Sequence, residues 1–287
     1  MATKSKIYLA IIATLIFFNW WAWLAFGGAQ SRELKVTFFN VGQGDATLVS
    51  APHNFQILVD GGPNNEVLSK VGSVMPRGDK TIELVVISHP DRDHISGLVE
   101  ILRRYKVEHV LLTLVSHNLA EYQEVQKLIK DKMIPMVIAR APQRLSWGDG
   151  YLDVLYPFKI ATSSVAENKT NQTSIVSRLV FGESSVLFSG DLEAPQELEL
   201  EFKGIALSSD ILKVAHHGSK NSSSERFLET VRPQLAIISV ASKNLYKHPH
   251  QEVLDRLSEK NIKILRTDIE GDITLKSDGL DWQLVEK

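Results

Sequence analysis

Apolar residues along this chain follow strand-like and helix-like spacings in a regular order. Leu84–Ser88 is a short, fully apolar run typical of a buried strand, and Ile95–Tyr105 carries apolar residues three and four positions apart, as on one face of a helix. A last hairpin is expected to turn near Gly271–Asp272. We expect further strands at residues 33–40, 46–50, 55–60, 110–113, 135–139, 151–156, 173–181, 185–189, 211–215 and 235–240, and further helices at residues 64–74, 120–132, 195–202, 224–231 and 249–260.

This order of elements predicts the fold class. Strands mixed with helices, in two halves of similar length, are typical of an α/β fold in which helices cover two sheets, a four-layer αββα sandwich. At 287 residues, 44% of them hydrophobic, the chain is long enough to bury a sizeable core. A single domain over residues 30–287 is the simplest organisation, because no repeat or low-complexity tract interrupts it.

The first 29 residues differ in character from the rest. Ile7–Phe26 contains no charged residue, and Lys4 and Lys6 stand just before it. A helix of about 20 apolar residues can cross a bilayer, and positive charge favours keeping its own end in the cytoplasm. A retained membrane anchor at residues 7–26 and an export signal cleaved near Ala29 are both open. Either one places the remaining chain outside the cytoplasm.

Composition narrows the chemistry. The chain has no cysteine, which excludes disulfides and cysteine-ligated metal sites. Without residues 1–29 the formal net charge is −4 rather than −2, because only Lys4 and Lys6 are lost. A mildly acidic domain is no obvious nucleic-acid binder, yet between Ile205 and Arg266 ten Lys and Arg stand against six Asp and Glu. That stretch is either a flank that faces a polyanion or ordinary solvated surface.

The side chains best suited to chemistry directly follow the apolar strand at Leu84–Ser88. Four residues that can bind metals fall within six positions: His89, Asp91, Asp93 and His94. Residues two apart in an extended chain project to the same side, so the first three can converge. A mixed set of imidazoles and carboxylates suits zinc, manganese or iron better than calcium. The sequence therefore predicts a transition-metal site at this strand end.

Other predicted strand ends carry similar groups. Asp191 ends one apolar strand, and His216 and His217 end another. Asp45 and Asp60 each lie in a glycine-rich turn after a strand. Each is weak alone, because an aspartate beside glycine is usually a turn residue. Several polar strand ends in one chain indicate a shared site.

The ordered motifs NVGQGDA, VDGG, SHPDRDH, FSGDL and HHGS resemble those of the metallo-β-lactamase superfamily. In particular they resemble the hydrolase domain at the end of ComEC-type DNA-uptake proteins. The later residues Asn171–Ser174, Ser239, Asn244, Tyr246–Pro249 and Arg266–Asp268 resemble that branch as well. The resemblance covers residues 36–274 and implies the four-layer αββα fold of the superfamily and a metal-dependent hydrolase. Its motifs are specific for fold and branch, and less so for substrate.

The resemblance also implies two divalent metal ions, zinc or manganese. One site would use His89 and Asp91, with Asp191 bridging to the other. The second site would use three residues: Asp93, His94 and His216.

This chain departs from the commonest superfamily pattern at the first of these sites. Asp91 stands where a histidine is more usual, and no histidine occurs between His117 and His216 to supply a further ligand. Asn171 occupies that region instead. The first site is therefore expected to be richer in oxygen and to hold its ion more weakly.

Further residues are candidates for supporting roles. Asp45 and Asp60 are expected to orient histidine ligands, and His217 to face the substrate, although sequence alone does not separate it from His216. Lys220 and His248 are candidates for phosphate contact or for protonating a leaving group. His248 is equally compatible with a surface histidine at a helix start. As groups that take part in catalysis we expect Asp91, Asp93, Asp191 and His248.

Together these features predict an extracytoplasmic, binuclear hydrolase, a phosphodiesterase or nuclease that uses a metal-activated water. The expected substrate is a phosphodiester, with single-stranded DNA the favoured polymer, and the expected partners are the membrane and the DNA-uptake machinery. Two alternatives stay open. One is a hydrolase of small phosphoesters, such as choline phosphate groups, at the cell surface. The other is a catalytically weak binding module whose first site holds no metal.

Overall fold

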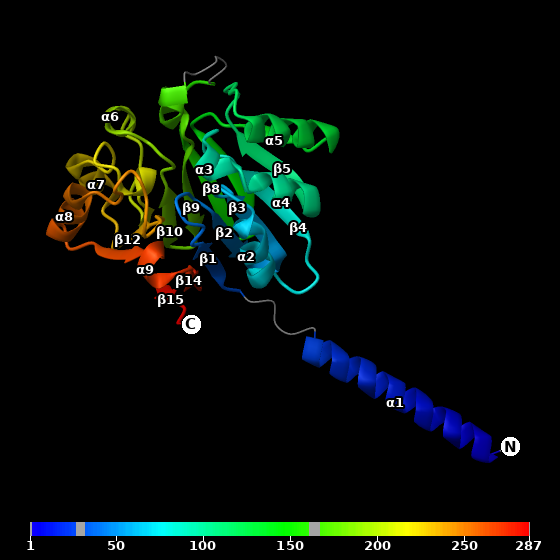
Figure 1. Cartoon of the computed structure of the whole chain (residues 1–287). Coiled ribbons are helices and arrows are strands. Elements are labelled where there is room, and N and C mark those ends of the chain that lie inside the picture. The colour runs from blue at the N-terminus through cyan, green and yellow to red at the C-terminus, as the bar shows by residue number, and fades with distance from the viewer. Residues whose placement is uncertain (1, 27–31, 161–166, 287) are drawn as a thin grey trace. The chain divides into compact units, whose positions relative to one another are not determined.

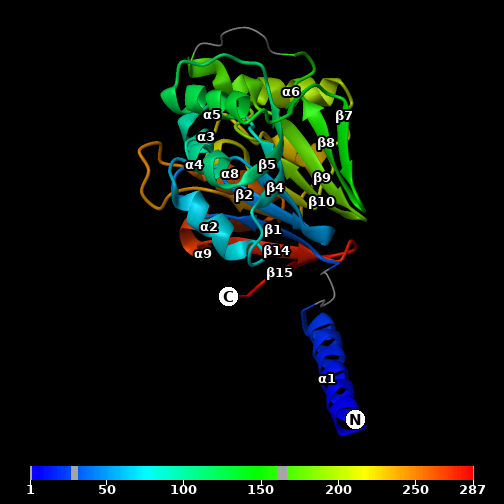
Figure 2. The same cartoon turned by 90° about the vertical axis from the view of Figure 1, so that its right-hand side faces the viewer.

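The computed structural model describes residues 2–26, 32–160 and 167–286, and the chain divides into two compact units, residues 1–32 and 33–287. In the first unit, residues 7–26 lie within one continuous helix, α1 (Ala2–Phe26), visible in Figures 1 and 2. Its large apolar side chains, such as Leu15 and Trp20, are more than half exposed. Among the residues described, no helix combines the length and apolar character that crossing a bilayer requires.

The second unit contains two sheets. The larger consists of β1 (Leu34–Phe38), β2 (Thr47–Ala51), β3 (Phe55–Val59), β4 (Thr81–Val86), β5 (Lys106–Leu112), β6 (Met136–Ile138), β14 (Ile273–Ser277) and β15 (Trp282–Leu284), in the spatial order β15-β14-β1-β2-β3-β4-β5-β6. The smaller consists of β7 (Gln143–Trp147), β8 (Gly150–Tyr156), β9 (Val176–Phe181), β10 (Ser184–Phe188), β11 (Ile211–Lys213), β12 (Leu235–Ile238) and β13 (Lys263–Arg266), in the order β13-β12-β11-β10-β9-β8-β7.

Helices cover the outer face of each sheet (Figure 1). The larger sheet carries α2 (Glu66–Val74), α3 (Arg92–Ile95), α4 (Leu98–Arg104) and α5 (Ala120–Asp131). The smaller sheet carries α6 (Ala194–Phe202), α7 (Glu225–Val231) and α8 (Gln251–Glu259). The expected four-layer αββα arrangement is therefore confirmed.

The alternation of side chains along a strand explains these layers. In β3, Ile57 and Val59 belong to the apolar cluster between the sheets, whereas Leu58 belongs to the cluster under α2, α4 and α5. In β12, Ile237 faces the inter-sheet cluster and Ile238 faces the cluster under α7 and α8. Successive residues of a strand point to opposite faces, so strands that are apolar throughout are buried on both sides.

The structure differs from the expected elements at three places. The helix expected over Ile95–Tyr105 is split into α3 and α4, because the Gly97 N–H leaves the helical pattern and donates to the carbonyl of Gly62 at 3.1 Å. The strand β7 was not expected. Its sequence QRLSW mixes polar and apolar residues, as suits the edge of a sheet, where one side is exposed.

The hairpin expected at Gly271–Asp272 is wrong. β13 lies in the smaller sheet and β14 in the larger, so the chain crosses between sheets here through the short helix α9 (Thr267–Glu270). The Asp272 carboxylate accepts from the backbone N–H of Asn40 and from the ammonium of Lys70, both at 2.7 Å, which fixes this residue at the larger sheet. The true hairpin joins β14 to β15.

We predict that residues 30–287 fold without the N-terminal helix. The three apolar clusters contain residues between Leu34 and Trp282, so this fragment keeps the whole described core. The expected result is one cooperative urea transition with retained near-ultraviolet circular dichroism, matching the full chain. Insoluble material, or a fragment that has lost its near-ultraviolet signal, would contradict the boundary.

Candidate metal centre

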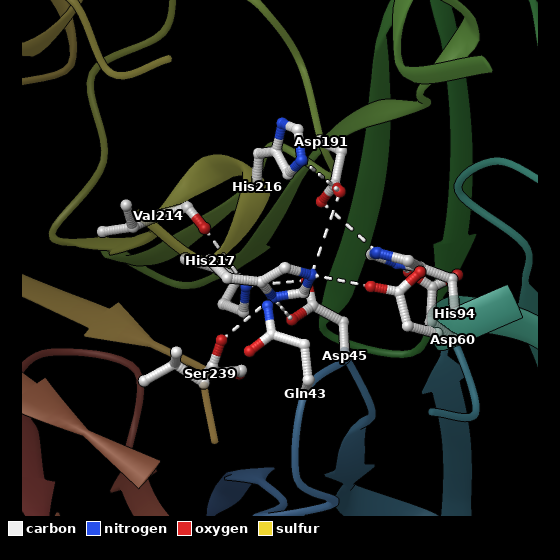
Figure 3. A network of polar contacts seen from close by, with 12 residues as sticks. Gln43, Asp45, Asp60, His94, Asp191, Val214, His216, His217 and Ser239 are labelled. Carbon is white, nitrogen blue, oxygen red and sulfur yellow. Dashed lines mark hydrogen bonds and ion pairs between the residues drawn. The ribbon is translucent and has the colours of Figure 1, made fainter. Parts of the chain in front are cut away.

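Polar side chains gather where strands of both sheets end (Figure 3). Asp60 directly follows β3, Asp191 follows β10, and His216 and His217 follow β11. Backbone hydrogen bonds hold these ends together. The His216 N–H donates to Gly190 at 3.2 Å, and the Ile175 N–H donates to Ser88 at 2.9 Å. The two sheets therefore form one rigid frame around the cluster.

The motif SHPDRDH meets the motif NVGQGDA at a close backbone approach. The Asp45 N–H donates to the Asp93 carbonyl at 3.2 Å. Gly44 has a φ of +148°, and a Cβ there would collide with that same carbonyl oxygen. Only glycine fits at this position, which explains the second glycine of the motif.

His94 contacts an aspartate on each side of its ring. Its Nδ1 lies 2.9 Å from Asp60 Oδ2, and its Nε2 lies 3.3 Å from Asp191 Oδ1. Asp60 is itself held by Ser88, whose N–H donates to Oδ1 at 2.8 Å and whose hydroxyl donates to Oδ2 at 2.7 Å. This arrangement fixes the ring and directs Nε2 into the site, as is usual for a metal-binding histidine.

A first group of possible ligands comprises His89, His94 and Asp191, whose ligand atoms all lie within 4.8 Å of one another. All three side chains are buried, and His89 Nε2, His94 Nε2 and Asp191 Oδ1 have no hydrogen-bond partner among the described residues. Although His94 Nε2 and Asp191 Oδ1 are 3.3 Å apart, they are not aligned as a hydrogen bond. Buried polar atoms left without partners are costly, so this set fits a bound cation.

Asp91 lies at the open side of this group. Its carboxylate is 3.6 Å from His89 Nε2, and the side chain is 29% exposed. Because its exposure keeps it partly hydrated, Asp91 differs from the buried Asp191. It can approach a cation held by the first group, and this agrees with the oxygen-rich site that the sequence suggests.

A second group comprises Asp93, His94 and His217. His217 Nε2 lies 3.1 Å from Asp93 Oδ2. On the other side of the ring, Nδ1 lies 2.9 Å from the carbonyl of Ser239, which can only accept a hydrogen bond. We assign the ring proton to Nδ1, which leaves the Nε2 lone pair free for a cation.

His216 lies apart from the second group, which differs from the ligand set suggested by the sequence. Its Nδ1 is 3.3 Å from the Asn171 side-chain amide, on the 3-10 helix Glu167–Thr173, and its Nε2 is 3.8 Å from Asp191 Oδ2. Both His216 and His217 have left-handed backbones, with φ of 50° and 53°. His217, and not His216, lies with Asp93 and His94 in the place that the sequence suggested for His216.

The charges of the cluster favour bound cations. Burial opposes protonation of His94, but Asp191 and Asp60 outweigh it and raise the pKa of His94 well above its usual range. Burial likewise opposes protonation of His217, and Asp191 and Asp45 raise its pKa to about 10. Burial also opposes ionisation of Asp191, yet His94 and His217 hold its pKa well below the usual range. Metal ions must displace the imidazole protons, so affinity should rise with pH.

A buried ion pair that the sequence did not reveal supports this cluster. The Lys213 ammonium lies 2.7 Å from Asp45 Oδ2 and also donates to the Val214 carbonyl at 3.1 Å. The other Asp45 oxygen lies 3.3 Å from His217 Nδ1. Asp45 therefore lies behind the His217 ring and not at the open site. The sequence did hold a signal for this pair. Lys213 lies within the apolar run ILKV, and a lysine in such a run must find an acidic partner if it is buried.

The remaining candidates lie at the rim. The His248 ring is buried, and its centroid is 5.4 Å from that of His216 and 6.3 Å from that of His217. Burial lowers the pKa of His248 to about 4, helped by the charges of His216 and His217. Lys220 is exposed, and its backbone N–H donates to His250 Nδ1 at 3.3 Å.

The sequence model of the metallo-beta-lactamase superfamily matches residues 39–242 of this chain. The chain belongs to the metallo-beta-lactamase superfamily. The matched range contains every residue of both ligand groups. The resemblance inferred from the motifs is confirmed.

Known relatives agree with this assignment. The chain is 29% identical over 260 residues to ComE operon protein 3 of Bacillus subtilis, covering 85% of this chain and 33% of the relative. It is 30% identical over 241 residues to competence protein ComA of Neisseria gonorrhoeae, covering 84% of this chain and 32% of the relative. The chain thus spans about a third of the length of these relatives.

A solved structure shows the same fold. The metallo hydrolase Igni18 of Ignicoccus hospitalis superposes with a TM-score of 0.56 at 15% identity, over 84% of this chain and 98% of that protein. This low identity supports the superfamily fold alone and says nothing of the substrate.

We predict that Lys213→Met lowers the free energy of unfolding by about 3–5 kcal/mol, because it leaves the buried Asp45 carboxylate without its partner. The matched control is Lys70→Met. Lys70 also pairs with an aspartate at 2.7 Å, but the two side chains are 23% and 34% exposed, so the expected loss is below about 1 kcal/mol. Urea titration measures both variants. Equal losses would show that burial of the Lys213 pair does not matter.

We also predict that His217→Ala strips bound metal more completely than His216→Ala, because the second ligand group contains His217. Elemental analysis after dialysis against a weak chelator measures the bound metal, and His109→Ala on the exposed side of β5 is the control. Greater metal loss from His216→Ala than from His217→Ala would contradict the grouping.

Proposed function

We propose that the chain is a metal-dependent phosphodiesterase whose polymer substrate is single-stranded DNA. The observation that carries the proposal is the first ligand group, in which three buried ligand atoms have no partner among the described residues, beside a second group that shares His94. Divalent cations bound there, zinc or manganese, would activate a water molecule and neutralise charge on the attacked phosphate. Two such ions are part of the proposal.

The chain's own residues would orient and hold these groups. Asp191 faces both groups, since its carboxylate lies 3.3 Å from His94 Nε2 and 3.9 Å from the Nε2 atoms of His89 and His217. It is therefore the residue suited to bridging. Asp60 and Asp45 keep the rings of His94 and His217 in place from behind.

The groups at the rim would meet the substrate. Because the pKa of His248 is lowered to about 4, its ring is neutral near pH 7 and is a poor proton donor to a leaving group. A neutral ring can still make a hydrogen bond. We assign His248 to phosphate contact. His216 and Asn171 would line the same opening, next to Asp191.

Two observations support DNA as the substrate. One similar protein is named as a competence protein, and the stretch from Ile205 to Arg266 carries an excess of basic residues beside the site. The overall acidity argues for binding that is weak and sensitive to salt. The proposal further places the domain outside the cytoplasm, in the context of DNA uptake. That part rests on the charge-free residues 7–26, which follow Lys4 and Lys6.

We predict that the metal-loaded chain cleaves bis(p-nitrophenyl) phosphate slowly and single-stranded DNA faster, and that a chelator abolishes both activities. Asp191→Ala should lower both rates by about a thousandfold, because bridging charge stabilisation contributes several kcal/mol to such reactions. Asp149→Ala, in an exposed turn, is the control and should leave both rates unchanged.

Two results would contradict the proposal. The first is a preparation that binds no zinc or manganese and shows no change in melting temperature when either is added. The second is turnover of a choline-phosphate ester without turnover of DNA in manganese, magnesium or zinc. That outcome would assign the same site to small phosphoesters.

A further inference from the structure

The segment between β12 and α8 presents apolar side chains to solvent next to the metal centre. We refer to residues 241–248 as the 241–248 loop. At its tip Leu245 is 97% exposed and Tyr246 is 66% exposed. Adjacent exposed apolar residues on a loop beside a candidate reaction centre suggest a binding role rather than packing.

This loop is held in shape by its own hydrogen bonds. The Asn244 side-chain amide donates to the carbonyls of Ala241 at 3.0 Å and His248 at 2.8 Å. Its oxygen accepts from the His248 N–H at 2.9 Å. At the base, the Ala241 N–H donates to the Gln43 side chain at 3.3 Å. These hydrogen bonds hold the two ends of the loop in place, and the exposed tip projects from them.

The far end of the loop is joined to the metal centre. The His250 N–H donates to the Gly218 carbonyl at 2.9 Å. Gly218 has a φ of +84°, and a Cβ there would lie only 2.5 Å from the Cβ of Pro249. The turn that carries His216 and His217 is thus packed directly against the end of the loop.

A row of rings leads from the tip of the loop to the candidate ligands. The Tyr246 ring stacks near-parallel on His248, with centroids 5.7 Å apart and planes at 25°. His248 in turn meets His216 edge-on at 5.4 Å, and His216 Nε2 is 3.8 Å from Asp191 Oδ2. A flat ring stacked on the outer face of Tyr246 would continue this row.

The loop is also positively charged and hollowed. Lys243 and Lys247 are exposed. The sequence holds no acidic residue between Ser239 and His250. A hollow of about 460 Å³ is lined by Ser242, Lys243, Asn244, Leu245, Lys247 and His248.

We infer that the 241–248 loop is a single-strand nucleic-acid binding lip. Tyr246 stacks on one unpaired base, and Lys243 and Lys247 contact the phosphates on either side of it. Aromatic stacking combined with lysine contacts to the backbone is the general way in which proteins hold single strands without reading their sequence. Paired bases do not offer a free face, so the lip selects single strands over duplex. This inference rests on the proposed function and names the part of the site that selects the polymer.

The test uses the full chain and a short fluorescent oligothymidylate, with the metal chelated so that no cleavage occurs. Tyr246→Ala should weaken binding about tenfold, the usual effect of losing one base stack, and Tyr246→Phe should bind like the wild type because it keeps the ring. The Lys243→Ala, Lys247→Ala double variant should lower the slope of log affinity against log salt by about 0.7 for each lysine. Lys127→Ala, on the exposed face of α5, is the charge-matched control and should change neither quantity.

Turnover separates this role from a merely structural one. With metal restored, Tyr246→Ala should raise KM for the oligonucleotide about tenfold and leave its kcat, and the turnover of bis(p-nitrophenyl) phosphate, within about twofold of wild type. A loss of small-diester turnover in the same variant would mean that the loop supports the metal centre and does not bind the polymer, and would overturn the inference.

Three other results would each overturn the inference about the 241–248 loop. Wild-type affinity in Tyr246→Ala would overturn the inference, as would equal binding of duplex and single strand by the unmodified chain. Failure of the unmodified chain to bind the oligonucleotide at low salt would also overturn it. If the loop variants lose binding as expected while no variant or metal gives diester cleavage, the lip stands and the proposed enzymatic function fails.

Discussion

The hydrogen bonds that the Asp60 carboxylate accepts from Ser88 and His94 are the interaction on which the site depends. They join the end of β3 to the end of β4 and fix the one imidazole that belongs to both ligand groups. Without this clamp, His94 would be free to rotate about its side-chain bonds, and Nε2 would not be held toward Asp191. The two parallel strands supply the rigidity, because their backbones are paired side by side up to Val59 and Val86. The Asp60 carboxylate is therefore held in one position, and its hydrogen bond with Nδ1 fixes the orientation of the His94 ring.

A second constraint is electrostatic. The carboxylates of Asp191, Asp60 and Asp45 are all buried in one small volume, and burying charge is costly unless an opposite charge lies beside it. Lys213 supplies that charge for Asp45 alone. Around Asp191 the balance must come from protonated imidazoles or from cations. The fold therefore contains a site that is stable only when positive charge occupies it, which is a physical reason to expect that it binds cations.

The sequence predicted the layers and the location of the site well, because both depend on local signals. The apolar runs ILV at residues 57–59 and LVVI at residues 84–87 are buried on both faces, and the polar residues that follow them gather at the strand ends. The assignment of His216 and His217 could not be predicted, since both residues have left-handed backbones and their ring partners, such as Asp93, Ser239 and Asn171, are distant in the sequence. The same limit applies to the crossing at Asp272 and to the burial of Lys213. Each depends on partners far away in the sequence, and local spacing carries no information about them.

The sharing of His94 has a consequence for how ions would enter. An imidazole nitrogen has one lone pair. His94 belongs to both ligand groups, and because its Nδ1 is engaged with Asp60, Nε2 is the atom that it can offer to an ion. Only one ion at a time can take that lone pair, so the other must rely on the remaining ligands of its own group and on Asp191. The two positions are therefore chemically unequal even though they are neighbours. The ion that holds His94 would have one more ligand from the chain than its neighbour, so the neighbour would exchange more readily with the surrounding solution.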